Sequence, residues 1–257
     1  ATEAEAPTGA AGVATATEVV AWYNGHPDHA GLSVRLDHER VVIIGNGNVA
    51  LDVARILTAD PDDLARTDIA DHALAALRAS TVREVVIAAR RGPIHSAFTL
   101  PELIGLTATA DVVLDAADHA LVQQELRDAV DPLTRSKLEI LAKLAEAGAV
   151  PTRPRIRFAY RLTPARITGT GRVDGVEFNR TGTDAVEHLG AGLVLTSIGY
   201  HGKAIRDLPF DEDAGVVPNE HGRVIGAPAT YVAGWIKRGP VGVIGTNKSD
   251  AAARSEE

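Results

Sequence analysis

Hydrophobic residues along the chain form two kinds of run, and each kind predicts a different element. Short continuous runs of aliphatic residues predict buried strands at 40–44, 84–89, 111–114 and 193–200. Between them, apolar residues recur at helical spacing and predict helices at 17–23, 48–57, 60–80, 119–130 and 133–147. Apolar strands that alternate with helices are typical of parallel sheets, so the pattern predicts an α/β fold with a three-layer, Rossmann-like core.

The pattern changes beyond residue 150. Residues 153–160 alternate arginine with apolar side chains, which predicts a strand with one solvated basic face. The segments 173–178 and 181–188 predict a hairpin, an antiparallel addition to the parallel sheet. Residues 201–229 are rich in Pro, Gly and Asp and predict little regular structure. In 230–248 a short strand and a basic turn precede a glycine-spaced run that should open a helix, but the residues that follow predict that it is not completed.

Composition narrows the class of protein. The 257 residues are 45% hydrophobic with a net charge of -8, which describes a globular chain and argues weakly against nucleic-acid binding. No apolar run approaches the ~18 residues of a membrane span, and no secretory signal is present, so we expect a cytoplasmic protein. The absence of cysteine excludes a disulfide framework and an iron–sulfur cluster or thiolate metal site held by this chain. Because the chain begins at Ala1 and contains no methionine, we expect a fragment of a longer protein.

The first predicted strand leads directly into a glycine-rich turn and a helix. Gly45 suits the tight turn, Gly47 allows backbone to approach a pyrophosphate, and the small Ala50 permits close packing of helix and strand. Amide groups at the start of the helix would then face the phosphates. The alternative is an ordinary strand-to-helix turn without a ligand. The predicted cofactor-binding residues of the turn are Gly45, Asn46, Gly47, Asn48 and Val49.

Two arginines follow the next strand, where a dinucleotide-binding fold faces the adenosine ribose. An acidic residue at this place would favour NAD, whereas Arg90 and Arg91 suit a 2′-phosphate and predict NADP. About 40 residues separate the turn from the pair, against a usual interval of ~20, and we assume that the intervening helix explains the excess. The alternative is a solvated pair. Glu102, close downstream, either orients the pair or touches the ribose, or is a first-turn helix charge.

Three further patterns invite a functional interpretation. His26 and His29 have metal-ligand spacing, but beside Pro27 they fit an exposed loop better, and no metal site is predicted. Residues 242–249 nearly match the phosphate-binding loop of nucleotide triphosphatases, but an asparagine replaces the glycine before the lysine. The basic residues of the helix at 133–147 are either solvated or face an acidic protein partner; they are Arg135, Lys137 and Lys143.

Several motifs in order carry a family resemblance. The turn at 45–57, ARRGP at 89–93, FTLPEL at 98–103 and GWIKRGPVGVIGTNK at 234–248 together resemble the adrenodoxin-reductase-like ferredoxin–NADP reductases of actinobacterial type. The resemblance extends from Val19 to Lys248. It implies an NADP domain inserted into an FAD domain. It also implies hydride transfer from NADPH to FAD and single-electron transfer to an iron–sulfur ferredoxin, which is fused to the reductase in some members.

The resemblance also implies roles for single residues. Residues 46–49 would lie along the NADP pyrophosphate, Arg90 and Arg91 at the 2′-phosphate, and Glu102 at the adenosine end. No general acid or base is required for hydride transfer, so no catalytic side chain is predicted. The residues implied to lie against FAD are Trp235, Gly242, Val243 and Ile244, with Gly242 near the nicotinamide.

The chain departs from the family at both ends. The glycine turn that binds the FAD pyrophosphate is missing, and no C-terminal helix is expected after Lys248. We therefore expect a linker or tail at 1–16, an NADP-binding domain at 17–200 and a partial FAD-domain segment at 201–257, and catalysis by the parent protein only. The alternative is a non-catalytic NADP-binding module or sensor.

Overall fold

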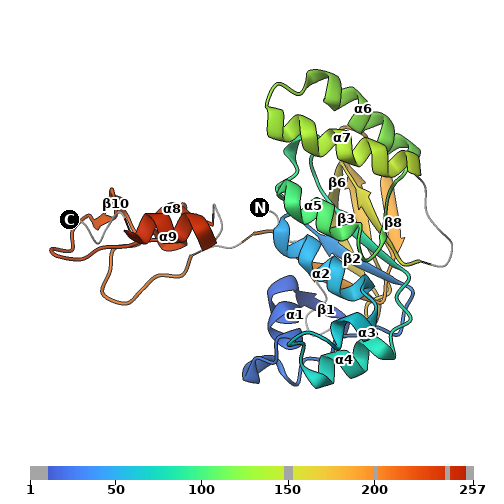
Figure 1. The fold of residues 1–257 in the computed structure, drawn as a ribbon, viewed down its shortest axis with the longest axis horizontal. Helices are drawn as coiled ribbons and strands as arrows, with labels where there is room; N and C mark the ends of the chain where they lie inside the picture. Colours follow the sequence, from blue (N-terminus) through green and yellow to red (C-terminus); the bar gives the residue numbers. More distant parts are fainter. Residues whose placement is uncertain (1–10, 148–152, 200–201, 241–243, 253–257) are drawn as a thin grey trace. The chain divides into compact units, whose positions relative to one another are not determined.

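The computed structural model describes residues 11–147, 153–199, 202–240 and 244–252. The chain divides into two compact units, Ala1–Ile198 and Gly199–Glu257 (Figure 1). The first unit contains the glycine turn and the arginine pair, and the second contains the motif that resembles a flavin-facing segment.

A parallel sheet of six strands forms the centre of the first unit. Its strand order is β1-β9-β2-β3-β5-β4, and every neighbouring pair is parallel. The strands are β1 (Val13–Thr15), β2 (Arg40–Ile44), β3 (Glu84–Ala88), β4 (Asp111–Leu114), β5 (Arg155–Ala159) and β9 (Leu193–Thr196). Because all strands run the same way, the residues after β2, β3 and β5 meet at one edge, where ligands of open α/β sheets bind.

The central strands are apolar on both faces because a different layer covers each face. Side chains alternate across a strand, so Val41 and Ile43 pack with the helices while Val42 and Ile44 belong to a second core. That second core includes Val176 and Phe178 of an antiparallel sheet. The continuous apolar runs in the sequence thus reflect burial on two sides.

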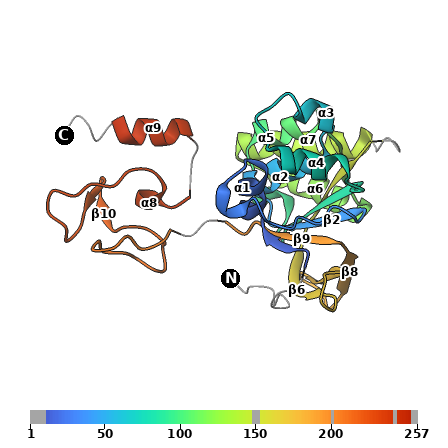
Figure 2. The same cartoon turned by 90° about the horizontal axis from the view of Figure 1, so that it is seen from below.

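Helices cover one face of the parallel sheet, as Figure 2 shows. The longest are α2 (Asn48–Thr58), α6 (Ala116–Asp128) and α7 (Pro132–Ala147). The shorter ones are α1 (Ala16–Tyr23), η1 (Pro27–His29), α3 (Pro61–Leu64), α4 (Asp71–Arg78), η2 (Pro93–His95) and α5 (Leu100–Leu106). The single long helix expected at 60–80 is wrong: it is two helices, α3 and α4, separated by a turn. In the described residues, no helix has both the length and the apolar character needed to cross a bilayer.

The opposite face carries the antiparallel strands. They are β6 (Leu162–Thr168), β7 (Gly175–Arg180) and β8 (Val186–Gly190), in the order β6-β7-β8. They form a sheet of their own rather than an extension of the parallel sheet. The predicted α/β fold with three layers and antiparallel additions is confirmed.

The expected tail contains regular structure at its end. Val13–Thr15 forms the edge strand β1 and pairs with β9, and α1 begins at Ala16. Thr15 Oγ1 accepts from the backbone N–H of Glu18 at 3.1 Å, and the Glu18 carboxylate accepts from the Thr15 backbone N–H at 2.7 Å. This capping box was readable as T-x-x-E, but a three-residue strand leaves too short a pattern to detect.

The second unit has a small core of its own. Val217, Val224 and Val232 are buried together, beside the two-residue strands β10 (Asn219–Glu220) and β11 (Arg223–Val224). Two helices follow, α8 (Trp235–Arg238) and α9 (Ile244–Ala252). The expectation that no helix is completed in this region is therefore wrong. Asp250, near the end of α9, accepts from Gly234 N at 2.6 Å and from Arg238 Nη1 at 2.9 Å, and it also pairs with Lys237.

Candidate dinucleotide site

The turn between β2 and α2 is fixed by one glycine. Gly45 has φ +117°, a backbone conformation that side chains disfavour. A Cβ atom at this position would lie 2.1 Å from the carbonyl oxygen of Ser197, the residue that follows β9. Ala50 is completely buried one helical turn later. The backbone of the turn therefore requires a glycine at position 45, and the close packing of α2 leaves room for only a small residue at position 50, as predicted.

The start of α2 is open to a ligand. Gly47 is the N-cap residue, makes no side-chain cap, and would have nothing within 4 Å of an added Cβ. The first hydrogen bond of the helix runs from Ala50 N to Gly47 O at 3.0 Å. The N–H groups of Asn48 and Val49 come before it, where a helix offers no internal acceptor. These amides and the positive end of the helix dipole suit an anion.

The two asparagines of the turn bind protein through their side chains. Asn48 Oδ1 accepts from the backbone N–H of Thr99 at 2.8 Å, and Asn46 Nδ2 lies 3.5 Å from Ser96 Oγ. They therefore join the glycine turn to the segment that follows the arginine pair. Residues 46–49 were expected along a pyrophosphate, and the backbone amides of this turn are the groups that its contacts leave available for one.

The arginine pair follows β3 at the same edge of the sheet. Arg90 and Arg91 are exposed, and their guanidinium groups make no hydrogen bond or ion pair with any residue that the structure describes. Their main chain is fixed, because Arg90 O accepts from Thr181 Oγ1 at 3.1 Å and Arg91 O accepts from Arg161 N at 3.3 Å. The pair is thus positioned through its backbone and free at its charged ends.

The segment after the pair, residues 92–99, is anchored to α6 and α7. Glu125 Oε2 accepts from Ile94 N at 2.6 Å. Lys137 Nζ donates to Ser96 O at 2.9 Å and to Phe98 O at 3.2 Å. Desolvation lowers the pKa of the Lys137 ammonium. Lys137 was one of three cations considered for a protein partner, but its amine is directed to these carbonyls instead.

The other candidates lie in several places. Glu102 is in the first turn of α5, three residues after the Thr99 amide that Asn48 binds. Trp235 begins α8 and Ile244 begins α9 in the second unit, whereas Gly242 and Val243 lie outside the described residues. The rings of His26 and His29 lie 5.6 Å apart, and His26 Nδ1 accepts from Asp28 N at 3.2 Å.

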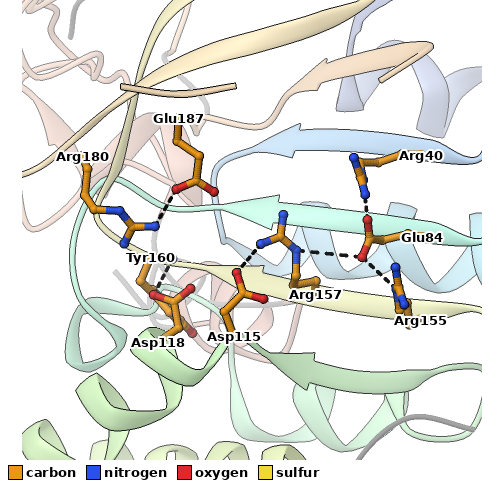
Figure 3. Close-up of polar contacts among 9 residues, drawn as sticks. All are labelled: Arg40, Glu84, Asp115, Asp118, Arg155, Arg157, Tyr160, Arg180 and Glu187. Atoms are coloured by element: carbon orange, nitrogen blue, oxygen red, sulfur yellow. Dashed lines mark hydrogen bonds and ion pairs between the residues drawn. The ribbon is translucent and has the colours of Figure 1, made fainter. Parts of the chain in front are cut away.

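A buried carboxyl group lies beside Tyr160, the residue that follows β5 (Figure 3). Asp118 of α6 is 2% exposed and accepts from the backbone N–H of Tyr160 at 3.3 Å. Burial raises the pKa of Asp118 to about 6, despite the opposing hydrogen bond from Tyr160. Tyr160 is also buried, and its hydroxyl lies 3.2 Å from Ser96 Oγ. The cluster thus connects α6 to the segment beside the arginine pair.

Replacing Asp118 with asparagine is expected to stabilise the protein near neutral pH. The folded carboxyl titrates about pH 6 against a reference of 3.8, so the folded state binds the extra proton between these values. Stability therefore falls as pH rises through that window, and the variant avoids a penalty of about 1–3 kcal/mol at pH 7.5. Denaturant unfolding at pH 4 and 7.5 measures this gain. The matched variant Asp128→Asn, exposed at the end of α6, should show none, and an equal loss at both pH values in Asp118→Asn would contradict the titration argument.

The amino ends of the same strands hold a second charged cluster. Glu84 is 5% exposed and pairs with Arg40 and with Arg155, the latter at 2.8 Å (Figure 3). Arg157 lies 3.9 Å from Glu84 and 2.6 Å from Asp115. Burial acts to raise the pKa of Glu84, but the arginines outweigh it, so the pKa lies below its usual value. The basic face expected for 153–160 is therefore ion-paired, and Arg157 is largely buried.

Comparisons with known proteins identify relatives of this chain. The chain is 67% identical over 251 residues to a probable ferredoxin/ferredoxin–NADP reductase of Mycobacterium tuberculosis, covering 94% of this chain and 44% of the relative. It is 40% identical over 270 residues to the mitochondrial NADPH:adrenodoxin oxidoreductase of Bos taurus, covering 93% of this chain and 54% of the relative. The solved structure of Mycobacterium tuberculosis FprA in complex with NADPH is similar with a TM-score of 0.86 and 45% identity, over 93% of this chain and 56% of that one. No protein-family model matches.

The chain therefore spans about half the length of the curated relatives that it matches. The resemblance to adrenodoxin-reductase-like ferredoxin–NADP reductases, inferred from four motifs in order, is confirmed by relatives that carry those names.

Proposed function

We propose that this chain is the NADP(H)-binding part of a flavin-dependent ferredoxin–NADP reductase. The observation that carries the proposal is the open start of α2 beside an exposed arginine pair, both at the carboxyl edge of one parallel sheet. A dinucleotide with a phosphate on its ribose requires both features. Neither is explained by the packing of the fold.

The residues present fit NADP. The amides of Asn48 and Val49 would bind the pyrophosphate over the open Gly47, with Gly45 shaping the turn and Asn46 joining it to Ser96. Arg90 and Arg91 would bind the 2′-phosphate, because guanidinium groups match phosphate oxygens in charge and geometry. Glu102 would lie toward the adenosine end. We propose these roles for the residues that the sequence singled out.

FAD and a ferredoxin complete the proposed reaction of the parent protein. When bound, NADPH supplies hydride and FAD accepts it, and a ferredoxin exchanges single electrons with the flavin. Trp235, Gly242, Val243 and Ile244 are proposed to lie against FAD, since they belong to the GWIKRGPVGVIGTNK motif of the resemblance. The relatives' names support the ferredoxin, and we extend this to an iron–sulfur protein that is fused to the reductase in the parent.

The proposal confines this chain to binding. Because the chain spans about half of its relatives, we propose that it is inactive alone as an electron-transfer catalyst. We keep the cytoplasm, expected from the sequence, as its proposed location.

Calorimetric titration of the chain with NADP⁺ and NAD⁺ tests the proposal. We expect NADP⁺ to bind at least tenfold more tightly, because one charge-assisted contact to the 2′-phosphate contributes about 1.5–3 kcal/mol. Adenosine 2′,5′-bisphosphate should bind as well, and 5′-AMP much more weakly. Equal affinities for NADP⁺ and NAD⁺, with a cooperative unfolding transition as proof of folding, would refute it.

A further inference from the structure

A third arginine lies beside the pair. Arg161 follows β5, the strand that pairs with β3 in parallel, so it stands at the same edge of the sheet as Arg90 and Arg91. The ladder continues past the strands, since Ala89 N donates to Ala159 O at 2.8 Å and Leu162 N donates to Ala89 O at 2.9 Å. Arg161 N itself donates to Arg91 O at 3.3 Å.

The backbone of Arg161 is held in an unfavourable conformation. Its φ is +57°, in the left-handed region that residues other than glycine and asparagine rarely adopt. Strain of this kind persists where the surrounding structure enforces it, and it is concentrated at functional sites. Here the enforcing contacts are the bond to Arg91 O and the bond from Thr181 N to Arg161 O at 2.7 Å. Thr181 also anchors Arg90 through its hydroxyl.

Arg161 also lacks a counter-charge within the described part of the chain. Most arginines there pair with a carboxylate, as Arg157 does with Asp115 and Arg180 does with Glu187. The exposed Arg161 has no side-chain hydrogen bond or ion pair with any described residue, and the same is true of its two neighbours. Three arginines whose backbones adjoin and whose charged ends have no described partner suit a phosphate dianion, which offers three acceptor oxygens.

We propose that Arg161 is a third ligand of the NADP 2′-phosphate and thus determines coenzyme preference together with Arg90 and Arg91. This inference rests on the proposed function. In the sequence, only the residues after β3 indicate specificity for NADP. The inference adds the short connection between β5 and β6, where Arg161 lies. The strained turn presents the third charge, and Thr181 links it to the pair.

Titration of Arg161→Gln tests the inference. Glutamine keeps much of the stem and removes the charge, so NADP⁺ and adenosine 2′,5′-bisphosphate should bind about tenfold more weakly, while NAD⁺ and 5′-AMP should change less than twofold. Arg161→Lys keeps the charge but not the planar guanidinium group, so its affinity for NADP⁺ should lie between those of the wild type and Arg161→Gln. The matched control is Arg83→Gln, an exposed arginine before β3 at the opposite edge of the sheet, and it should match the wild type.

Two results would overturn the inference. Unchanged NADP⁺ binding in folded Arg161→Gln would exclude a phosphate contact, and equal weakening for NADP⁺ and NAD⁺ would assign Arg161 to the adenine ring instead. Failure of the proposed function is distinguishable, because in that case the wild-type chain itself would not prefer NADP⁺ to NAD⁺.

Discussion

Replacing Arg90 and Arg91 together with alanine is expected to weaken NADP⁺ binding by a hundredfold or more and to leave NAD⁺ binding nearly unchanged. Each guanidinium would lose a charge-assisted contact of about 1.5–3 kcal/mol, and two such losses correspond to at least about a hundredfold in affinity. Both side chains are exposed and make no contact with a described partner, so the free energy of unfolding should stay within about 0.5 kcal/mol of wild type. Calorimetry with both coenzymes and denaturant unfolding measure the two effects.

The control for the double variant removes the same charge elsewhere. Arg83 and Arg127 are exposed outside the site, and replacing both with alanine should leave the preference for NADP⁺ intact. A similar loss of NADP⁺ affinity in the control would mean that the net charge of the chain, rather than the pair, attracts the coenzyme. If the double variant lost affinity for NAD⁺ to the same extent, the arginine pair would not be a ligand of the 2′-phosphate.

Gly45→Ala is expected to destabilise the fold by about 3 kcal/mol or more. The new Cβ would lie 2.1 Å from Ser197 O, which is backbone and held by the bond from Ser197 N to Ile44 O at 2.7 Å. The φ of +117° adds strain that no repacking of side chains relieves. Urea unfolding followed by circular dichroism measures the change. The control Gly105→Ala, at a helical position with nothing within 4 Å, should be neutral or slightly stabilising.

Gly47→Ala distinguishes the proposed role of Gly47 in binding from the structural role of Gly45. An alanine there has open space and an ordinary φ of -87°, so the free energy of unfolding should change by less than about 1 kcal/mol. NADP⁺ and NAD⁺ should both bind at least tenfold more weakly, because the methyl group occupies the approach to the pyrophosphate. Full affinity in Gly47→Ala would show that the dinucleotide does not pass over this turn.

The sequence predicted the fold where the physical signal is local. The apolar runs at β2 and β3 are continuous because both faces are buried, and the glycine turn follows from the residue types that its backbone requires. The edge strand β1 and the helix α9 were missed for a different reason. β1 has three residues, and its pairing with β9 brings together positions about 180 residues apart, a partner that no local pattern reveals. In α9, Asp250 binds Gly234 and Arg238, which lie 16 and 12 residues earlier in the chain, and no local pattern reveals these contacts either.

In the candidate site, too, the residues with a local sequence signal were predicted and those that act through distant contacts were not. Gly47, Arg90 and Arg91 were predicted from residue type and position, because a glycine turn and a basic pair after neighbouring strands suit a dinucleotide phosphate. The supporting contacts of Glu125 and Lys137 were not, since a glutamate and a lysine on amphipathic helices are usually only solvated. Only the fold shows that their charged ends reach the backbone of the segment beside the pair.

The contacts that hold residues 90–99 have a consequence for how coenzyme preference can change. Thr181, Glu125, Lys137 and Asn48 all bind this stretch through its main-chain carbonyl and amide groups. Every residue type offers a main-chain carbonyl, and the side chains of Arg90 and Arg91 make no hydrogen bond or ion pair with a described residue, so these two side chains can be exchanged without disturbing the support of the stretch. We therefore expect that selection or protein engineering can change the proposed coenzyme preference by replacing Arg90 and Arg91, together with Arg161, without rebuilding the backbone that holds the pair.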